Sequence, residues 1–293
     1  MAVECHLYLP QLRMSMDGIV ERAAAAERTG FTGIALMDHL APPGALDAPM
    51  FEAIVSATWL AARTERLAVG HLVLCDAFRH PALLAKQAVT LDHASGGRFE
   101  LGLGWGSMPD EIEAYGIGDV APRVRVARLA ETLEVLQRLW SGETVNYQGL
   151  HHTLRDVRPR PTPLRHIPIV IGGTGPRTLD LVAAYADWWN LPVTALEHLD
   201  RLRPRAGKAR VSVQQLVTVI STEAERTATV ATALRRFGPM AGENGMVVGN
   251  VRELTAHFRA LADRGVERFY TWFTDFAPTP TLEIFGEVIA ALR

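Results

Sequence analysis

Short hydrophobic runs alternate with longer amphipathic segments along the chain, and this alternation repeats eight times. A short apolar run bounded by turn residues predicts a buried strand, whereas apolar positions three and four residues apart predict a helix that packs on one face. Eight such strand–helix units account for the chain and leave no further strand. The predicted strands cover residues 3–9, 33–37, 67–74, 99–103, 167–171, 188–191, 211–220 and 266–273.

Strands separated by helices must run parallel, and their connections are right-handed. Eight such units close into a barrel, so the predicted fold is α/β, a (β/α)8 TIM barrel. We expect a single domain over residues 1–293, with an insertion after strand 4. An open doubly wound sheet is the competing architecture, but the first strand–helix turn lacks a GxGxxG sequence and no composition break marks a second domain.

The inserted segment covers about residues 142–165 and departs from the strand–helix pattern. It is rich in threonine, histidine, arginine and proline, and it predicts a small hairpin. Elsewhere the helix boundaries are marked by residues with known preferences. Asn250 is placed to cap a helix that carries Leu254, Phe258 and Leu261, and Gly265 is placed to end it.

The charge balance limits the partners that the protein can attract. The chain contains 30 Lys and Arg and 32 Asp and Glu, a net charge of -2. A balanced surface has no global field for nucleic acid or an anionic membrane, so we expect a small-molecule partner. The two cysteines, Cys5 and Cys75, form no CxxC pair, which indicates a reducing compartment and no metal site. No signal peptide or membrane-spanning run is visible, so we expect a cytoplasmic protein.

The loops that follow barrel strands are where catalytic residues gather. Asp38 and His39 come directly after the second predicted strand. A histidine there could donate a hydrogen bond or exchange a proton near neutral pH. The alternative is that the pair only caps the following loop.

A glycine-rich turn, Gly172-Gly173-Thr174-Gly175-Pro176, follows the fifth predicted strand. Glycines let a phosphate approach the backbone, and the helix that follows presents free N–H groups to it. The alternative is an ordinary glycine-rich strand–helix turn. The similar segment 102–106 is interpreted as a strand end and turn.

Other polar and aromatic residues have structural interpretations that compete with functional ones. His6 and His71 lie inside predicted strands and are interpreted as core histidines. Two arginine clusters, at 123–128 and 155–165, are interpreted as solvated surface. Four tryptophans could line a pocket for a planar ligand, although core packing is the default: Trp105, Trp188, Trp189 and Trp272. The sequence contains no HExxH, GxSxG or Walker A motif.

Four blocks of the sequence resemble the luciferase-like monooxygenase superfamily, and within it the branch of F420-dependent oxidoreductases. They cover residues 26–40, 64–106, 111–117 together with 128–149, and 167–190. The most specific block includes the segment RHPALLAKQAVTLDHASGGRFELGLG. The last third of the chain is similar in layout more than in motif.

This resemblance implies a (β/α)8 barrel whose cofactor ring lies against the third strand, where a non-proline cis peptide would join Leu72 and Val73. It also implies that His39 lies at the reactive edge of the ring. The residues that it places near the cofactor are Leu72, Val73, Trp105 and Gly106, with Gly172, Gly173 and Thr174 at its phosphate.

The chain departs from the sugar-phosphate dehydrogenases of that branch in two places. They have a glutamate where this chain has Ser107, and a tryptophan soon after the Asp-His pair, where this chain reads APPGALDAP. Sugar-phosphate oxidation is therefore not expected. His39 is also taken to have no carboxylate partner.

The resemblance favours hydride transfer with coenzyme F420, and reduction of an activated C=C or C=N bond is its simplest form. The candidate catalytic residues are His39, Asp38 and Ser107, where His39 or a water on Ser107 would deliver the proton. One alternative is a monooxygenase that uses reduced FMN and oxygen, with a separate reductase to supply the reduced cofactor. Another is a barrel that binds a flavin or deazaflavin without catalysis. A homodimer is common among relatives, whereas substrate and reaction direction rest on variable loops.

Overall fold

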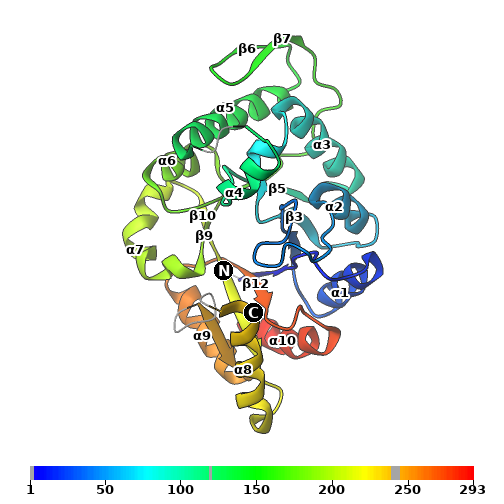
Figure 1. The fold of residues 1–293 in the computed structure, drawn as a ribbon, viewed down its shortest axis with the longest axis vertical. Coiled ribbons are helices and arrows are strands. Elements are labelled where there is room, and N and C mark those ends of the chain that lie inside the picture. Colours follow the sequence, from blue (N-terminus) through cyan, green and yellow to red (C-terminus); the bar gives the residue numbers. More distant parts are fainter. Residues whose placement is uncertain (1–2, 119–120, 239–244) are drawn as a thin grey trace.

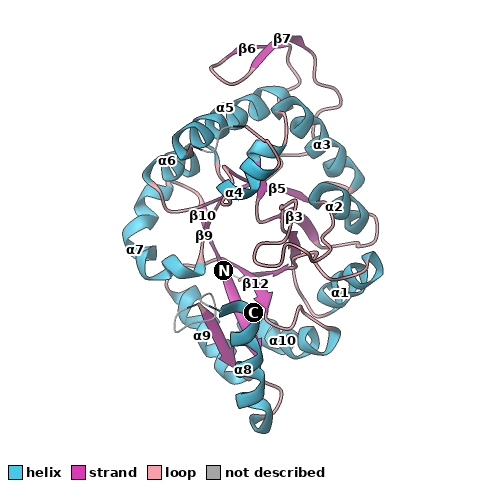
Figure 2. Ribbon diagram, in the orientation of Figure 1, coloured by secondary structure: helices cyan, strands magenta, loops and turns pink. Residues whose placement is uncertain are grey.

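Eight parallel strands close into a barrel in the computed structural model, which describes residues 3–118, 121–238 and 245–293. Around the barrel the hydrogen-bonded order is β1-β2-β3-β5-β8-β9-β10-β12, and β12 pairs with β1 to close it. Helices surround the strands on the outside (Figure 1; Figure 2). The predicted (β/α)8 fold is therefore confirmed.

The strand and helix boundaries agree with the predicted units within a few residues. The strands are β1 (Glu4–Tyr8), β2 (Gly33–Leu36), β3 (Ala68–His71), β4 (Leu74–Cys75), β5 (Phe99–Gly104), β6 (Val145–Gln148), β7 (Thr153–Val157), β8 (Ile169–Gly172), β9 (Trp188–Leu191), β10 (Arg210–Val219), β11 (Met246–Gly249) and β12 (Arg268–Phe273). The α-helices are α1 (Met16–Arg28), α2 (Ala53–Ala61), α3 (Pro81–Ala94), α4 (Pro109–Ala114), α5 (Pro122–Trp140), α6 (Pro176–Tyr185), α7 (Leu199–Leu202), α8 (Arg226–Phe237), α9 (Val251–Asp263) and α10 (Thr279–Leu292).

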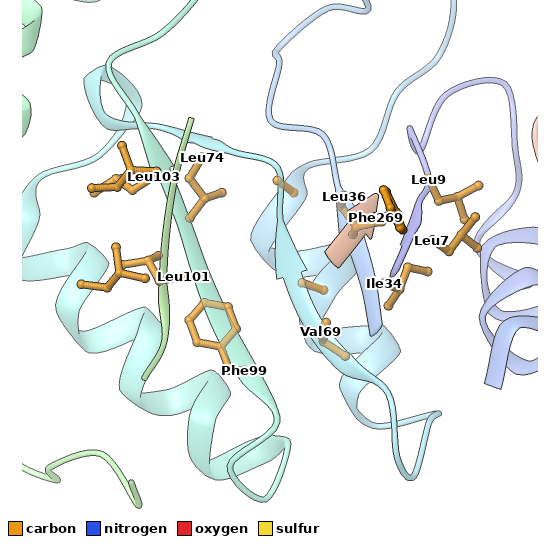
Figure 3. Close-up of a cluster of buried hydrophobic side chains, with 14 of the residues drawn as sticks. Leu7, Leu9, Ile34, Leu36, Val69, Leu74, Phe99, Leu101, Leu103 and Phe269 are labelled. Carbon is orange, nitrogen blue, oxygen red and sulfur yellow. The ribbon is translucent and has the colours of Figure 1, made fainter. Parts of the chain in front are cut away.

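The side chains of β5 alternate between the two faces of the barrel wall. Phe99, Leu101 and Leu103 are buried in the core between strands and helices (Figure 3). Glu100 and Gly102 occupy the intervening positions, which a strand turns to its other face. Burial of the apolar face is what fixes the register, because a shift by one residue would turn all three large side chains into the barrel interior and Glu100 into the apolar core.

An ionic cluster fills the interior at the opposite end of the barrel from the strand carboxyl ends. The Arg268 guanidinium is 3% exposed and lies 2.6 Å from Glu100 Oε2 and 2.5 Å from Glu4 Oε2. It also stacks 3.7 Å from the centroid of the Trp188 ring. The barrel is therefore closed at this end by paired charges, which leaves its other end for a ligand.

Two details differ from the predicted pattern. A further parallel strand, β11, lies between α8 and α9 in the chain and pairs with β10. The eight predicted strand–helix units therefore do not account for every strand. The third predicted strand is divided into β3 and β4 at Leu72–Val73, because β3 pairs with the start of β5 and β4 with its end. The predicted hairpin is present as the antiparallel pair β6–β7, which projects beyond the ring of helices (Figure 1).

Candidate active site

A cavity of about 550 Å³ opens at the carboxyl ends of the barrel strands. That volume is in the range of small-molecule and cofactor sites. Its walls come from the ends of most barrel strands and from the loops that follow β2 and β5. The lining residues are Tyr8, Met37, Asp38, His39, Pro43, Leu72, Val73, Leu74, Cys75, Gly104, Trp105, Gly106, Ser107, Met108, Glu111, Ile112, Gly172, Gly173, Asn190, Pro192, Gln214 and Trp272.

One wall of the cavity is formed by Leu72 and Val73, between β3 and β4, and we call these two residues the apolar shelf. The Leu72–Val73 peptide bond is cis, at the position that the resemblance implied. Glycines on the neighbouring strand make room for this shelf. A Cβ atom at Gly102 would lie 1.8 Å from the His71 carbonyl oxygen, and one at Gly104 would lie 2.7 Å from Val73 Cγ2. Only glycine therefore fits at these two positions of β5.

The glycine-rich turn lies across the cavity, between β8 and helix α6. Gly172 and Gly173 line the cavity, and Gly173 has a φ of 123°, a conformation that side chains disfavour. The Trp189 indole N–H donates to the Gly173 carbonyl at 2.8 Å and holds the turn in place. Thr174 follows the turn, partly exposed, and it is not among the described residues that line the cavity. The first N–H groups of α6 have no partner inside the helix, as at any helix N-terminus.

His39 has a carboxylate partner, contrary to the sequence interpretation. Its Nδ1 lies 2.8 Å from Glu111 Oε2. The other oxygen of Glu111 accepts the backbone N–H groups of Leu40, at 2.6 Å, and Ala41, at 3.2 Å. Because an ionised carboxylate only accepts hydrogen bonds, Nδ1 is the donor of this pair. The proton-exchanging position of the ring is then Nε2, which has no hydrogen-bond partner in the described part of the chain.

Asp38 is held by a different set of partners. Arg79 donates to both of its oxygens, at 2.6 and 2.9 Å, and the Cys75 N–H donates to Oδ2 at 2.7 Å. The side chain is 4% exposed. A carboxylate with both oxygens occupied is suited to holding the ends of β2 and β4 together. We therefore predict that Asp38 positions His39 and does not itself exchange a proton.

Replacing Asp38 by Asn is expected to lower the free energy of unfolding by about 3 kcal/mol, because Arg79 would remain buried without its main counter-charge. Glu52→Gln is the control, since Glu52 contacts the same arginine at 2.7 Å but is 45% exposed. That control should cost less than about 1 kcal/mol. Urea denaturation measures both. A stable Asp38→Asn protein that binds cofactor but lacks turnover would instead assign Asp38 a catalytic role.

The loop after β5 brings Trp105, Gly106 and Ser107 to the cavity wall. Its support comes from helix α5. Arg125 is 5% exposed, donates to the Gly106 carbonyl at 2.9 Å, and stacks 4.7 Å from the Trp105 ring centroid. The interpretation of residues 123–128 as solvated surface is therefore wrong for Arg125, because it braces the loop from inside. Ser107 is exposed at the cavity mouth.

His71 is a buried histidine behind the shelf, as the sequence indicated. Its Nε2 lies 3.1 Å from the Ala53 carbonyl oxygen, and burial lowers its pKa to about 4. A histidine with a lowered folded-state pKa stabilises the protein fully above pH 6.5, and this contribution is lost as pH falls toward 4.

The acid sensitivity that His71 contributes is expected to disappear in a His71→Gln variant, in which the amide can still donate to Ala53. The difference in unfolding free energy between pH 7 and pH 5 should shrink by about 2 kcal/mol. His93→Gln, which changes an exposed histidine, should leave that difference unchanged. An equal effect of the two substitutions would contradict the assignment. Urea denaturation at the two pH values is the measurement.

The sequence analysis did not predict several of the residues that line the cavity. Glu111 is part of a block that carried the resemblance, but nothing in the sequence linked it to His39. Tyr8 and Gln214 come from the strands β1 and β10, and only their places on barrel strands could have indicated them. Of the four tryptophans, Trp105 and Trp272 line the cavity, whereas Trp188 and Trp189 are buried in the core.

The fold and the cavity define a (β/α)8 barrel with a small-molecule site at the strand carboxyl ends, built from an apolar shelf, a glycine turn and a histidine–glutamate pair. The sequence matches the family described as luciferase-like monooxygenase over residues 2–276. The chain therefore belongs to the luciferase-like monooxygenase family, as the resemblance indicated.

Individual relatives agree with this assignment. An F420-dependent glucose-6-phosphate dehydrogenase of Microbacterium testaceum is 34% identical over 178 residues, which cover 58% of this chain and 50% of that protein. The chain thus spans about half the length of the curated relatives it matches. An F420-dependent secondary alcohol dehydrogenase, solved with an F420-acetone adduct, has a TM-score of 0.86 and 20% identity over all of both chains. EDTA monooxygenase from Chelativorans sp. BNC1 has a TM-score of 0.83 and 15% identity, covering 100% of this chain and 94% of its own. The last two show the fold alone.

Among the described residues, no helix combines the length and the apolar character needed to cross a membrane. The cytoplasmic location stays a prediction.

Proposed function

We propose that this protein is an oxidoreductase that uses coenzyme F420 for hydride transfer to or from a small organic substrate. The observation that carries the proposal is the His39–Glu111 pair, held 2.8 Å apart at the wall of a cavity that also has an apolar shelf and a glycine turn. Positioned proton donors of this kind contribute about 10²–10⁴-fold to rates. The names of the relatives above support the choice of cofactor.

The residues present fit a phosphate-bearing planar cofactor. Leu72 and Val73 offer an apolar wall, for which the glycines of β5 leave room. Gly172 and Gly173 precede the N-terminus of α6, where unpaired N–H groups and the helix dipole favour a phosphate. Thr174 could add a hydroxyl there. Bound F420 would supply the hydride for a reduction or accept it in an oxidation.

The protein's own part is to hold the substrate beside His39 and to move one proton. In a reduction, the ring protonated on both nitrogens gives its Nε2 proton to the substrate, and in an oxidation the neutral ring takes up the proton of a hydroxyl at Nε2. Glu111 fixes the ring so that Nε2 is the available nitrogen. Ser107, at the cavity mouth, can hold a water that connects this nitrogen with solvent. Reduction of an activated C=C or C=N bond remains the first reaction class to test.

The rival is a monooxygenase that uses reduced FMN and oxygen and receives its flavin from a separate reductase. The shelf and the glycine turn fit an FMN ring and phosphate as well as those of F420. A barrel that binds either cofactor without catalysis is a second alternative, but it gives no reason for a histidine–glutamate pair in the wall. A homodimer, and any reductase partner, stay predictions.

Titration of purified protein with F420 and FMN, in both redox states, tests the proposal. Tight F420 binding with weak FMN binding, followed by visible absorbance and fluorescence, is the expected result. Tight binding of reduced FMN, with a peroxide-like absorbance after oxygen is added, would replace the proposal by the monooxygenase alternative. Binding of neither cofactor would overturn both.

A further inference from the structure

We infer that the substrate is a small, uncharged and largely apolar molecule, and that phosphorylated substrates are excluded. This inference rests on the proposed function and specifies its substrate class. It depends on the charges of the cavity wall, on how those charges are paired, and on the side chains that surround His39.

Both carboxylates of the wall are fully engaged with the protein itself. Asp38 accepts from Arg79 and from the Cys75 N–H. Glu111 accepts from the ring of His39 and from two backbone N–H groups. Neither carboxylate is therefore available to bind a cationic group of a substrate without losing these hydrogen bonds.

Positive charge for an anionic substrate is missing as well. Within residues 3–118, 121–238 and 245–293, no lysine or arginine lines the cavity. Two arginines lie just behind the wall, but each has a partner: Arg79 binds Asp38 and Glu52, and Arg125 binds the Gly106 carbonyl and stacks on Trp105. A phosphate group would thus be desolvated beside two carboxylates without a counter-charge, which is strongly unfavourable.

One feature of the cavity does favour an anion, namely the glycine turn at the N-terminus of α6. In the proposed function the cofactor phosphate occupies it. A phosphorylated substrate would need a second site of the same kind, and the other lining residues offer none with positive charge. With the cofactor bound at this turn, the described lysines and arginines leave the cavity wall without a site for a substrate phosphate.

The side chains around His39 favour an apolar substrate. His39 shares the cavity wall with Met37, Pro43, Met108 and Ile112, which have no hydrogen-bonding group suited to a sugar ring. Burial of apolar substrate surface against them contributes about 25 cal/mol per Å². The other polar side chains of the wall, besides His39 and the two paired carboxylates, are Tyr8, Ser107, Asn190 and Gln214. They are too few to replace all the hydrogen bonds to water that a polyhydroxylated substrate would lose.

Binding to the protein saturated with oxidised F420 tests the inference without requiring turnover. Ligand-observed NMR would compare cyclohexanol, glucose and glucose 6-phosphate. We expect cyclohexanol to bind at least about tenfold more tightly than either sugar. Glucose 6-phosphate binding as tight as that of cyclohexanol, and persisting at saturating F420, would overturn the inference. Binding of glucose 6-phosphate that F420 displaces occurs at the glycine turn and supports it.

A substitution in the wall provides an independent arm. Met108 is 37% exposed, so Met108→Arg can add a cation without disturbing the core. It should increase the affinity for glucose 6-phosphate at least about tenfold, whereas Met108→Gln should not. Failure of F420 to bind is a failure of the proposed function and is visible before substrate is added. In that case saturating inorganic phosphate takes the place of F420 at the glycine turn, and the same outcomes decide the substrate class.

Discussion

Replacing His39 by Asn is expected to lower kcat by about 10²–10⁴-fold while F420 affinity stays nearly unchanged. The asparagine amide can place a donor near the position of Nδ1, so that the bond to Glu111 is retained, but it has no equivalent of Nε2. The variant therefore removes the proton-exchanging atom and leaves the loop anchored. Steady-state kinetics and fluorescence titration of F420 are the measurements.

Glu111→Gln serves as the companion to this substitution. The glutamine keeps an oxygen for the N–H groups of Leu40 and Ala41, but it presents an amide to His39 where a carboxylate stood. We expect a smaller loss of kcat than in His39→Asn, together with a displaced pH–rate profile, because Glu111 acts through the histidine. A His39→Asn enzyme whose kcat stays within about tenfold of the wild type would show that His39 is not the proton carrier.

Replacing Gly102 by Ala is expected to have the largest effect on stability, with a loss of about 3 kcal/mol or more in the free energy of unfolding. The added Cβ would lie 1.8 Å from the His71 carbonyl oxygen, which is backbone and cannot move aside alone. The displaced carbonyl belongs to the residue before Leu72. The apolar shelf should therefore be deformed, and F420 affinity should fall together with stability.

Gly172→Ala is the matched control for stability. Gly172 is likewise a glycine of a barrel strand, the last residue of β8, but its added Cβ would meet the Asn190 carbonyl oxygen at 3.7 Å, an ordinary contact. We expect its unfolding free energy to change by less than about 0.5 kcal/mol. Urea denaturation compares the two proteins. A Gly102→Ala protein as stable as Gly172→Ala would mean that the shelf yields easily and does not constrain β5.

The glycines of β5 show that a sequence pattern can indicate a strand end without indicating why glycine is required there. The segment 102–106 looked like an ordinary strand end, and its glycines could be explained by a turn. For Gly102 and Gly104 the actual reason is the close approach of His71 and Val73, which only the assembled sheet reveals, whereas Gly106, with a φ of 87°, does belong to a turn. In the sequence, a glycine that makes room for a neighbouring backbone cannot be distinguished from a glycine that forms a turn.

Glu111 illustrates the same limit for the site. It lies 72 residues from His39, on the short helix α4, and its contact exists only because the loops after β2 and β5 meet at one end of the barrel. Arg125 was misread for a similar reason, since a helix sequence does not indicate which arginine turns inward. β11 was missed although other strands of four residues were predicted, because it lies at the edge of the sheet beside β10 and three of its four residues are only half-buried.

The sequence by itself determined the eight barrel strands, the hairpin insertion, and the placement of His39 and the glycine turn after strands. Each of these follows from local physics: burial imposes the alternation of apolar residues, and parallel strands place their carboxyl ends together. Only the tertiary structure decided which groups touch: Glu111 with His39, Arg79 with Asp38, and Gly102 with the His71 carbonyl. Such contacts join distant parts of the chain, and no local preference encodes them.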